Sequence, residues 1–112
     1  MDENKLIEEI KEILLKHKCS EKRITSGEIA RRLNIDPDDQ TTLRTRNLIR
    51  KTMEETGLPI AANSKGYCII TSEDEYKNYI NNLRARRKGI KERMSLVEEN
   101  WKKYDEKNNN KK

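Results

Sequence analysis

Apolar residues recur at helical spacing in the first third of the chain. A first helix, from about Glu3 to Lys18, is predicted by apolar positions three or four residues apart: Leu6, Ile7, Ile10, Ile13 and Leu14. Thr25 and Glu28 match a capping box and predict the start of a second helix, which Asn34 is suited to end in a left-handed conformation. Its expected buried stripe is Ile29, Ala30 and Leu33. Ile35 is then expected to fill the core from the following turn.

A third helix is expected to end at Gly57. It begins either at Asp36, as the cap residue before Pro37, or near Asp39. Ile49 and Met53 are expected to mark its core face. At 100° per residue, the opposite face then carries a polar stripe: Gln40, Arg44, Asn47 and Lys51. Leu43 and Leu48 fit neither face, which leaves the rotation of this helix open.

Two short apolar runs after Gly57 predict a β-hairpin from Leu58 to Ile70. They are separated by Asn-Ser-Lys-Gly, in which Gly66 supplies the positive φ that a tight turn needs. Pro59 indicates an edge position near the strand start. Ile24 is expected to pair with the hairpin as a third short strand.

The last third of the chain carries a heptad pattern. Ser72 and Glu75 match a second capping box, and a long helix is expected to follow as far as Tyr104. Its seam residues alternate four and three positions apart: Tyr76, Ile80, Leu83, Arg87, Ile90, Met94, Val97, Trp101 and Tyr104. The polar segment 105–112 is expected to be disordered. The expected organisation is therefore a domain at 1–71, a long helix at 72–104 and a tail at 105–112.

Composition limits how much of this chain can be buried. Charged residues make up 40% of the 112 residues, hydrophobic residues 32%, and Phe is absent, so part of the chain must be solvated helix or depend on a partner. The net charge of +5 fits an anionic partner. The segment Arg84–Arg93 has six basic residues and one acid, so its net charge equals that of the whole chain. This cluster is either a phosphate contact or a solvated helix face.

The residues that usually carry chemistry are sparse. Cys19, Cys68 and the single histidine, His17, lack the spacing of metal ligands, so we expect two free thiols, a helix-end histidine and no metal. The first residues resemble no signal peptide, and no run approaches the roughly 20 apolar residues of a membrane span. A cytoplasmic, reducing setting is expected. No catalytic constellation stands out, so neither enzymatic activity nor a cofactor is expected.

The run from Ile24 to Ile70 resembles the compact winged helix-turn-helix domains of phage and mobile-element DNA-binding proteins. The matching segments are 24–33, 50–60 and 64–67, which cover under half of the chain. The resemblance implies a mainly α fold with a small β-hairpin, in which the third helix and the hairpin, or wing, bind DNA. The long helix that follows, coiled-coil-like in pattern, departs from such a minimal domain.

We expect double-stranded DNA as the partner. Arg is suited to guanine, Asn and Gln to adenine, and Lys to phosphate. The expected contact residues are Gln40, Thr41, Arg44, Asn47 and Lys51 in the third helix, with Asn63, Ser64 and Lys65 in the wing. Thr45 is a further candidate for phosphate or thymine-methyl contact. The alternative is that these polar residues only line a solvated helix and turn.

The heptad seam has three interpretations: a homodimer interface, a helix that folds back on the first helix, or a docking surface for another protein. In a parallel dimer Arg86 would repel Lys91 of the partner while Arg93 would attract Glu98, so polarity stays open. The favoured function is a homodimeric, sequence-specific regulator or accessory factor. The alternative is a protein–protein adaptor or inhibitor that uses a winged-helix scaffold against a nucleoprotein complex.

Overall fold

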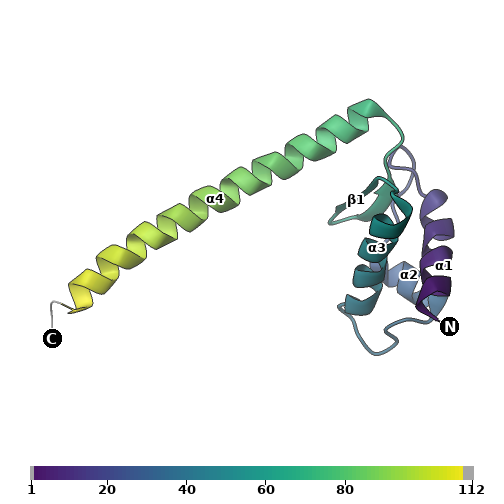
Figure 1. Ribbon diagram of the computed structural model, residues 1–112, viewed down its shortest axis with the longest axis horizontal. Helices are drawn as coiled ribbons and strands as arrows, with labels where there is room; N and C mark the ends of the chain where they lie inside the picture. The colour runs from purple at the N-terminus through teal and green to yellow at the C-terminus, as the bar shows by residue number, and fades with distance from the viewer. Residues whose placement is uncertain (1, 110–112) are drawn as a thin grey trace. The chain divides into compact units, whose positions relative to one another are not determined.

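The computed structural model in Figure 1 describes residues 2–109. Its elements are α1 (Glu3–Leu15), α2 (Ser26–Leu33), α3 (Leu43–Thr56), β1 (Ile60–Asn63), β2 (Gly66–Ile69) and α4 (Glu73–Asn109). The chain divides into two compact units, Met1–Tyr76 and Lys77–Lys112. The predicted class, mainly α with one antiparallel hairpin and a long C-terminal helix, is confirmed. Three helices followed by a hairpin are consistent with a winged-helix-like layout.

The first unit is built around an aliphatic core between its helices and the hairpin. Helix α1 packs mainly against α3, as Figure 1 shows. The buried cluster comprises Leu6, Ile7, Ile10, Leu14, Ile24, Ile29, Ala30, Ile35, Leu48, Ile49, Ile60 and Ile69. Ile35 fills the core from the turn after α2, as predicted. Burying each leucine or isoleucine of this cluster stabilises the fold by roughly 1.5–3 kcal/mol, so the cluster supplies most of the driving force.

Local sequence signals set several helix ends. The Thr25 hydroxyl accepts from the backbone amide of Glu28 at 3.1 Å, and Asn34 ends α2 with φ 53°, both as predicted. The Ser72 hydroxyl accepts from the amide of Glu75 at 3.2 Å. The Glu75 carboxylate in turn accepts from the backbone amide of Thr71 at 2.9 Å, and this bond lowers the pKa of Glu75.

Helix α1 ends at Leu15, earlier than expected, because the next residues pair with the hairpin. The amide of Ile69 donates to the carbonyl of His17 at 2.8 Å, and the amide of Cys19 donates to the carbonyl of Ile69 at 2.9 Å. Lys18 thereby forms a parallel bridge with Ile69. Such pairing needs extended backbone, so the helix stops before it.

The hairpin aligns Ile60 with Ile69 and Asn63 with Gly66. Ile24 forms an antiparallel bridge with Tyr67, which confirms the predicted third strand position. Gly66 has φ 123°, and a Cβ at this position would lie 2.5 Å from the carbonyl oxygen of Ile24. Both the backbone conformation and the close approach of that third segment therefore require glycine.

Helix α4 is longer than the heptad pattern predicts. It runs for 37 residues, from Glu73 to Asn109. Residues 105–109, which the sequence predicts to be disordered, belong to the helix; the rest of the predicted tail, 110–112, lies outside the described residues.

Candidate nucleic-acid interface

Helix α3 begins at Leu43, so both starts predicted from the sequence are wrong. Asp36 lies at the start of a loop that continues to Thr42, so no helix follows it directly. The Asp39 carboxylate accepts from the backbone amide of Thr41 at 2.9 Å and from that of Leu43 at 3.3 Å. The Asp39 carboxylate also accepts from the Thr41 hydroxyl, and this bond is the largest cause of the lowered pKa of Asp39. The two backbone bonds lower that pKa further. Aspartates that bond nearby backbone in this way favour a loop over helix, and α3 starts only where the loop ends.

The late start removes two predicted contact residues from α3. Gln40 lies in the loop before the helix, where it lines a pocket with Arg31. Thr41 is exposed in the same loop, and its carbonyl accepts from Nε of Arg46 at 3.0 Å. The predicted stripe therefore starts at Arg44 rather than at Gln40.

The core face of α3 is also rotated from the predicted one. It consists of Thr45, Leu48, Ile49 and Thr52, whereas Met53 is 37% exposed. At 100° per residue this is a rotation of roughly 70°. Thr45 is fully buried, so its predicted contact with DNA is wrong. The two threonines are buried because their hydroxyls are satisfied, Thr45 by the Asp36 carboxylate and Thr52 by the carbonyl of Leu48.

The rotation defines which side chains α3 presents to solvent. Projected at 100° per residue, Leu43, Asn47, Arg50 and Glu54 are the residues nearest the middle of this face. Arg46 flanks it on one side, and Arg44 and Lys51 flank it on the other. Leu43 is 54% exposed and Leu48 is buried, which resolves the rotation left open by the sequence. Arg46 and Arg50 were missed because the buried threonines were counted as polar.

The cations of α3 differ in how far they are already paired. Lys51 bonds Glu3 of α1, and this contact raises the pKa of Lys51. Nε of Arg50 lies 3.6 Å from the Glu54 carboxylate, on an exposed pair. Among residues 2–109, no hydrogen bond or ion pair engages the side chains of Arg44 and Asn47. These two exposed groups are therefore available to an outside ligand.

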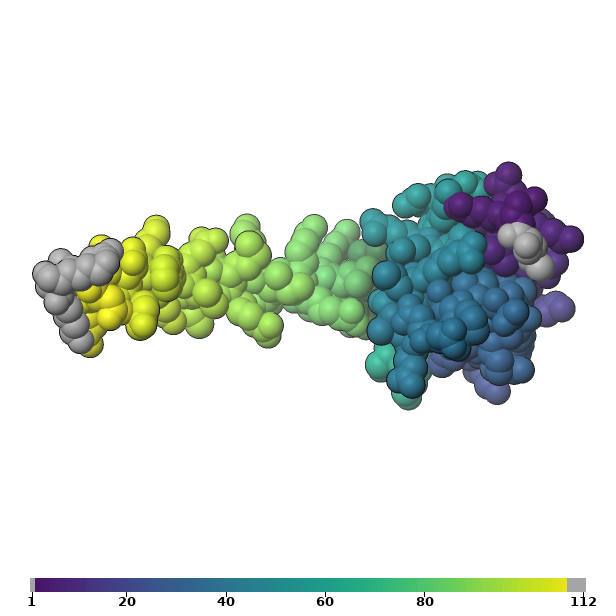
Figure 2. All heavy atoms as spheres, turned by 90° about the horizontal axis from the view of Figure 1, so that it is seen from below, coloured from purple at the N-terminus to yellow at the C-terminus, as the bar shows by residue number. Residues whose placement is uncertain are grey.

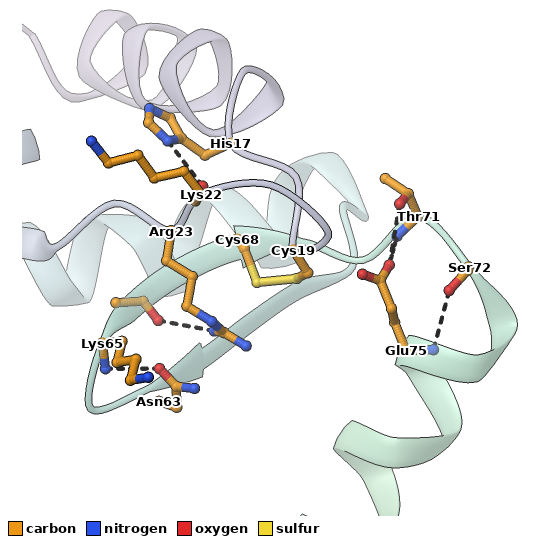
Figure 3. Close-up of a disulfide and its surroundings, with 11 residues drawn as sticks. His17, Cys19, Lys22, Arg23, Asn63, Lys65, Cys68, Thr71, Ser72 and Glu75 are labelled. Carbon is orange, nitrogen blue, oxygen red and sulfur yellow. Dashed lines mark hydrogen bonds between the residues drawn. A yellow bond between two sulfur atoms is a disulfide. The ribbon is translucent and has the colours of Figure 1, made fainter.

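The wing places a short polar tip beside a bracing arginine (Figure 3). Asn63, Ser64 and Lys65 are all exposed at this tip. The Asn63 side-chain oxygen accepts from the backbone amide of Lys65 at 2.8 Å, which stiffens the turn. The Arg23 guanidinium donates to the carbonyl of Gly66 at 3.2 Å. These two bonds fix the turn that carries the side-chain amide nitrogen of Asn63 and the ammonium group of Lys65.

A disulfide joins Cys19 to Cys68, so the expectation of two free thiols is wrong (Figure 3). The two cysteines are 49 positions apart in sequence, and Cys68 is fully buried in β2. The bridge ties the wing to the loop after α1. Sequence spacing could not reveal it, because the two segments meet only through the pairing of Lys18 with Ile69. Because both cysteines are in the disulfide, their state does not support the expected reducing compartment.

Helix α4, which runs from green to yellow in Figure 2, exposes an apolar stripe along its length. Ile90 is 56% and Trp101 is 59% exposed, and the rings of Trp101 and Tyr104 stack with centroids 5.8 Å apart. Large apolar side chains exposed in such a row suggest an interface. The exposed large apolar residues of this helix are Tyr76, Leu83, Ile90, Met94, Leu96, Val97, Trp101 and Tyr104.

Two other kinds of site are not found in the part of the chain that the structure describes. None of its helices has the length and apolar character needed to cross a membrane. Nor do its His, Cys, Asp and Glu side chains gather in a group of three or more that would hold a metal ion. Comparisons with protein-family models, curated proteins and solved structures found no significant match.

Proposed function

We propose that this chain is a homodimeric, sequence-specific DNA-binding protein of the phage or mobile-element type, acting as a regulator or accessory factor. The observation that supports this most directly is the solvent face of α3. There Arg46, Asn47 and Arg50 share one exposed surface, with Arg44 unpaired at its edge. Arg binds guanine and Asn binds adenine through paired hydrogen bonds in the major groove, which is wide enough to admit a helix.

The wing and α4 complete the proposed mechanism. Lys65 and the neighbouring Asn63 suit phosphate contact, which fixes position without specifying bases. The basic residues of the cluster Arg84–Arg93 that lie outside the seam are exposed and add a second anion-binding surface. Two copies joined through α4 hold two DNA-contacting helices together, which raises affinity through effective concentration. This mechanism needs no catalytic group and no cofactor.

Selection from random duplex DNA, followed by fluorescence anisotropy at about 50 and 200 mM salt, tests the proposal. We expect the selected duplex to bind roughly 1,000-fold or more tightly than a scrambled one, and affinity for both to fall with salt. Equal affinity for selected and scrambled duplexes would contradict sequence-specific binding.

A protein–protein adaptor is the second candidate, and the exposed apolar stripe of α4 favours it. Such a protein needs no base contacts, so its action on a nucleoprotein complex would survive replacement of Arg44 and Asn47. No measurable binding to any duplex, together with a stable complex through α4, would favour the adaptor over the DNA-binding protein.

A further inference from the structure

The charges that border the apolar seam of α4 form two different rows. In a heptad written abcdefg, the seam takes positions a and d, and the e and g residues lie at its edges. Ile80, Arg87, Met94 and Trp101 occupy a, and the other seam residues occupy d. The e row is Lys77, Arg84, Lys91, Glu98 and Asp105. The g row is Tyr79, Arg86, Arg93, Asn100 and Lys107.

The e row changes sign along the helix, from three cations to two carboxylates, whereas the g row contains no acid. In a parallel pair each e row faces the g row of the other helix. Arg86 then faces the partner's Lys91, and of the g-row arginines only Arg93 faces an acid, the partner's Glu98. A parallel, in-register pair also sets the two Arg87 side chains opposite each other within the seam. Two like charges taken out of water together are costly.

An antiparallel pair brings each e row against the e row of the other helix, running in the opposite direction. We propose that α4 pairs with α4 of a second copy of this chain in antiparallel orientation, cationic e residues against acidic ones. This rests on the homodimer proposed above and specifies its polarity. In the register that places Ile80 opposite the partner's Tyr104, Arg87 lies opposite the partner's Val97.

The charge balance favours this arrangement. Arg84 faces the partner's Glu98 and Lys77 faces the partner's Asp105, and symmetry repeats each contact. Two like-charged contacts remain, Lys91 with the partner's Lys91 and Arg93 with the partner's Arg93. Four attractive contacts thus stand against two repulsive ones, whereas the parallel pair has two of each. Arg87 no longer meets its own copy.

Spin-label distances measure the polarity directly. Asn81 and Lys102 are exposed and lie at b positions, outside the seam and its edges. The full-length Asn81→Cys and Lys102→Cys variants, labelled without reducing the native disulfide, each carry one label per chain. At 1.5 Å per residue the antiparallel overlap separates the two labels by about 33 Å at position 81 and about 30 Å at position 102. A parallel pair places both at one level, within roughly 15 Å.

We expect double electron–electron resonance distances of about 30–35 Å for both variants. Distances below about 20 Å at both positions would overturn the proposal in favour of a parallel pair. Failure to see any distance between chains at tens of micromolar protein would overturn it as well. Anisotropy on the same samples separates the two proposals, because a parallel dimer that still binds its selected duplex overturns the polarity alone.

A charge swap gives an independent test by sedimentation. Glu98→Lys should weaken the dimer on the order of tenfold, because attraction becomes repulsion at two exposed contacts. Adding Arg84→Glu should restore the dimer if the helices are antiparallel. Restoration by Arg93→Glu instead would show that Glu98 faces Arg93 and would overturn the proposal.

Discussion

The carboxylate of Asp36 accepts two hydrogen bonds from Thr45, one from its backbone amide and one from its hydroxyl, both at 2.9 Å. Thr45 is the third residue of α3, so Asp36 satisfies a free amide at the start of that helix from nine positions upstream. The same contact satisfies the buried Thr45 hydroxyl. It therefore helps to set the rotation that turns Arg46 and Asn47 toward solvent.

Asp36→Ala should destabilise the first unit by roughly 1–2 kcal/mol, because a charged helix cap is lost and a buried hydroxyl loses its partner. Urea denaturation measures the change in the free energy of unfolding, and hydrogen exchange at the Thr45 amide locates it. Asp38→Ala is the matched control, since Asp38 is exposed in the same loop and should change stability by less than about 0.5 kcal/mol. Equal loss in both variants would contradict the capping role.

Features that depend on neighbours in sequence could be predicted. The caps at Thr25 and Ser72, the left-handed Asn34 and the glycine at the wing each follow from backbone requirements within a few residues. The burial of Ile35 could be predicted because an isoleucine in a turn between two helices gains free energy by packing into the adjacent core. These signals were enough to give the fold class and the order of the elements.

Features that depend on contacts distant in sequence were missed. The start of α3 is set by the Asp36 and Asp39 loop bonds, and its rotation by Thr45 and Thr52, which are buried although polar. The pattern of apolar and polar residues does not reveal that Asp36, nine positions away, accepts a hydrogen bond from the Thr45 hydroxyl. The disulfide likewise joins two segments that only the hairpin brings together. The residues of the candidate site shifted accordingly, from Gln40 toward Arg46 and Arg50.

Arg44→Ala and Asn47→Ala should each cost roughly 1–3 kcal/mol on a selected duplex and much less on a scrambled one. Both side chains are exposed on α3 and lack partners among the described residues, so their loss should leave the fold intact. Selection from random DNA with each variant should give a relaxed preference at one base position. Glu12→Ala, exposed on α1, serves as the control. Unchanged preference in both variants would mean that α3 does not contact the bases.

Lys65→Ala should weaken binding about equally on selected and scrambled duplexes. The ammonium sits at the exposed wing tip, where it suits phosphate rather than a base edge. The slope of log affinity against log salt should become shallower by roughly one unit, since one counterion fewer is released. Ser64→Ala, at the same turn, should leave that slope alone. If the Lys65→Ala variant instead lost its preference for the selected duplex while the salt slope stayed unchanged, Lys65 would contact bases and the assignment to phosphate would be wrong.

The pKa of Glu28 should lie far below the usual range of a glutamate. Hydrogen bonds from Arg31 and Arg32 lower its pKa from 4.5 to about 2, with Arg31 the larger cause. Because the folded pKa is depressed, these contacts stabilise the fold above about pH 4.5, and that contribution is lost as pH falls toward 2. Carbon-detected NMR titration follows the carboxyl directly. In the Arg31→Gln, Arg32→Gln variant the pKa should return toward 4.5; an ordinary value in the wild type would show that these pairs do not persist in solution.

Reduction of the Cys19–Cys68 disulfide should loosen the wing and weaken the whole first unit. The bridge closes a loop of 49 positions, for which chain entropy gives a stabilisation of about 4 kcal/mol. That is a large part of the roughly 5–15 kcal/mol that holds a small domain folded. Thiol titration of the denatured protein should find no free thiol before reduction and two afterwards.

The Cys19→Ala, Cys68→Ala variant separates loss of the bridge from other effects of the reductant. Its urea midpoint should be lowered and should no longer respond to dithiothreitol, whereas the wild-type midpoint should fall on reduction. DNA affinity should fall with it, because Cys68 lies in β2, next to the wing tip that carries Lys65. A wild-type midpoint that dithiothreitol leaves unchanged would mean that hydrogen bonding of Ile69 with His17 and Cys19 holds the wing without the disulfide.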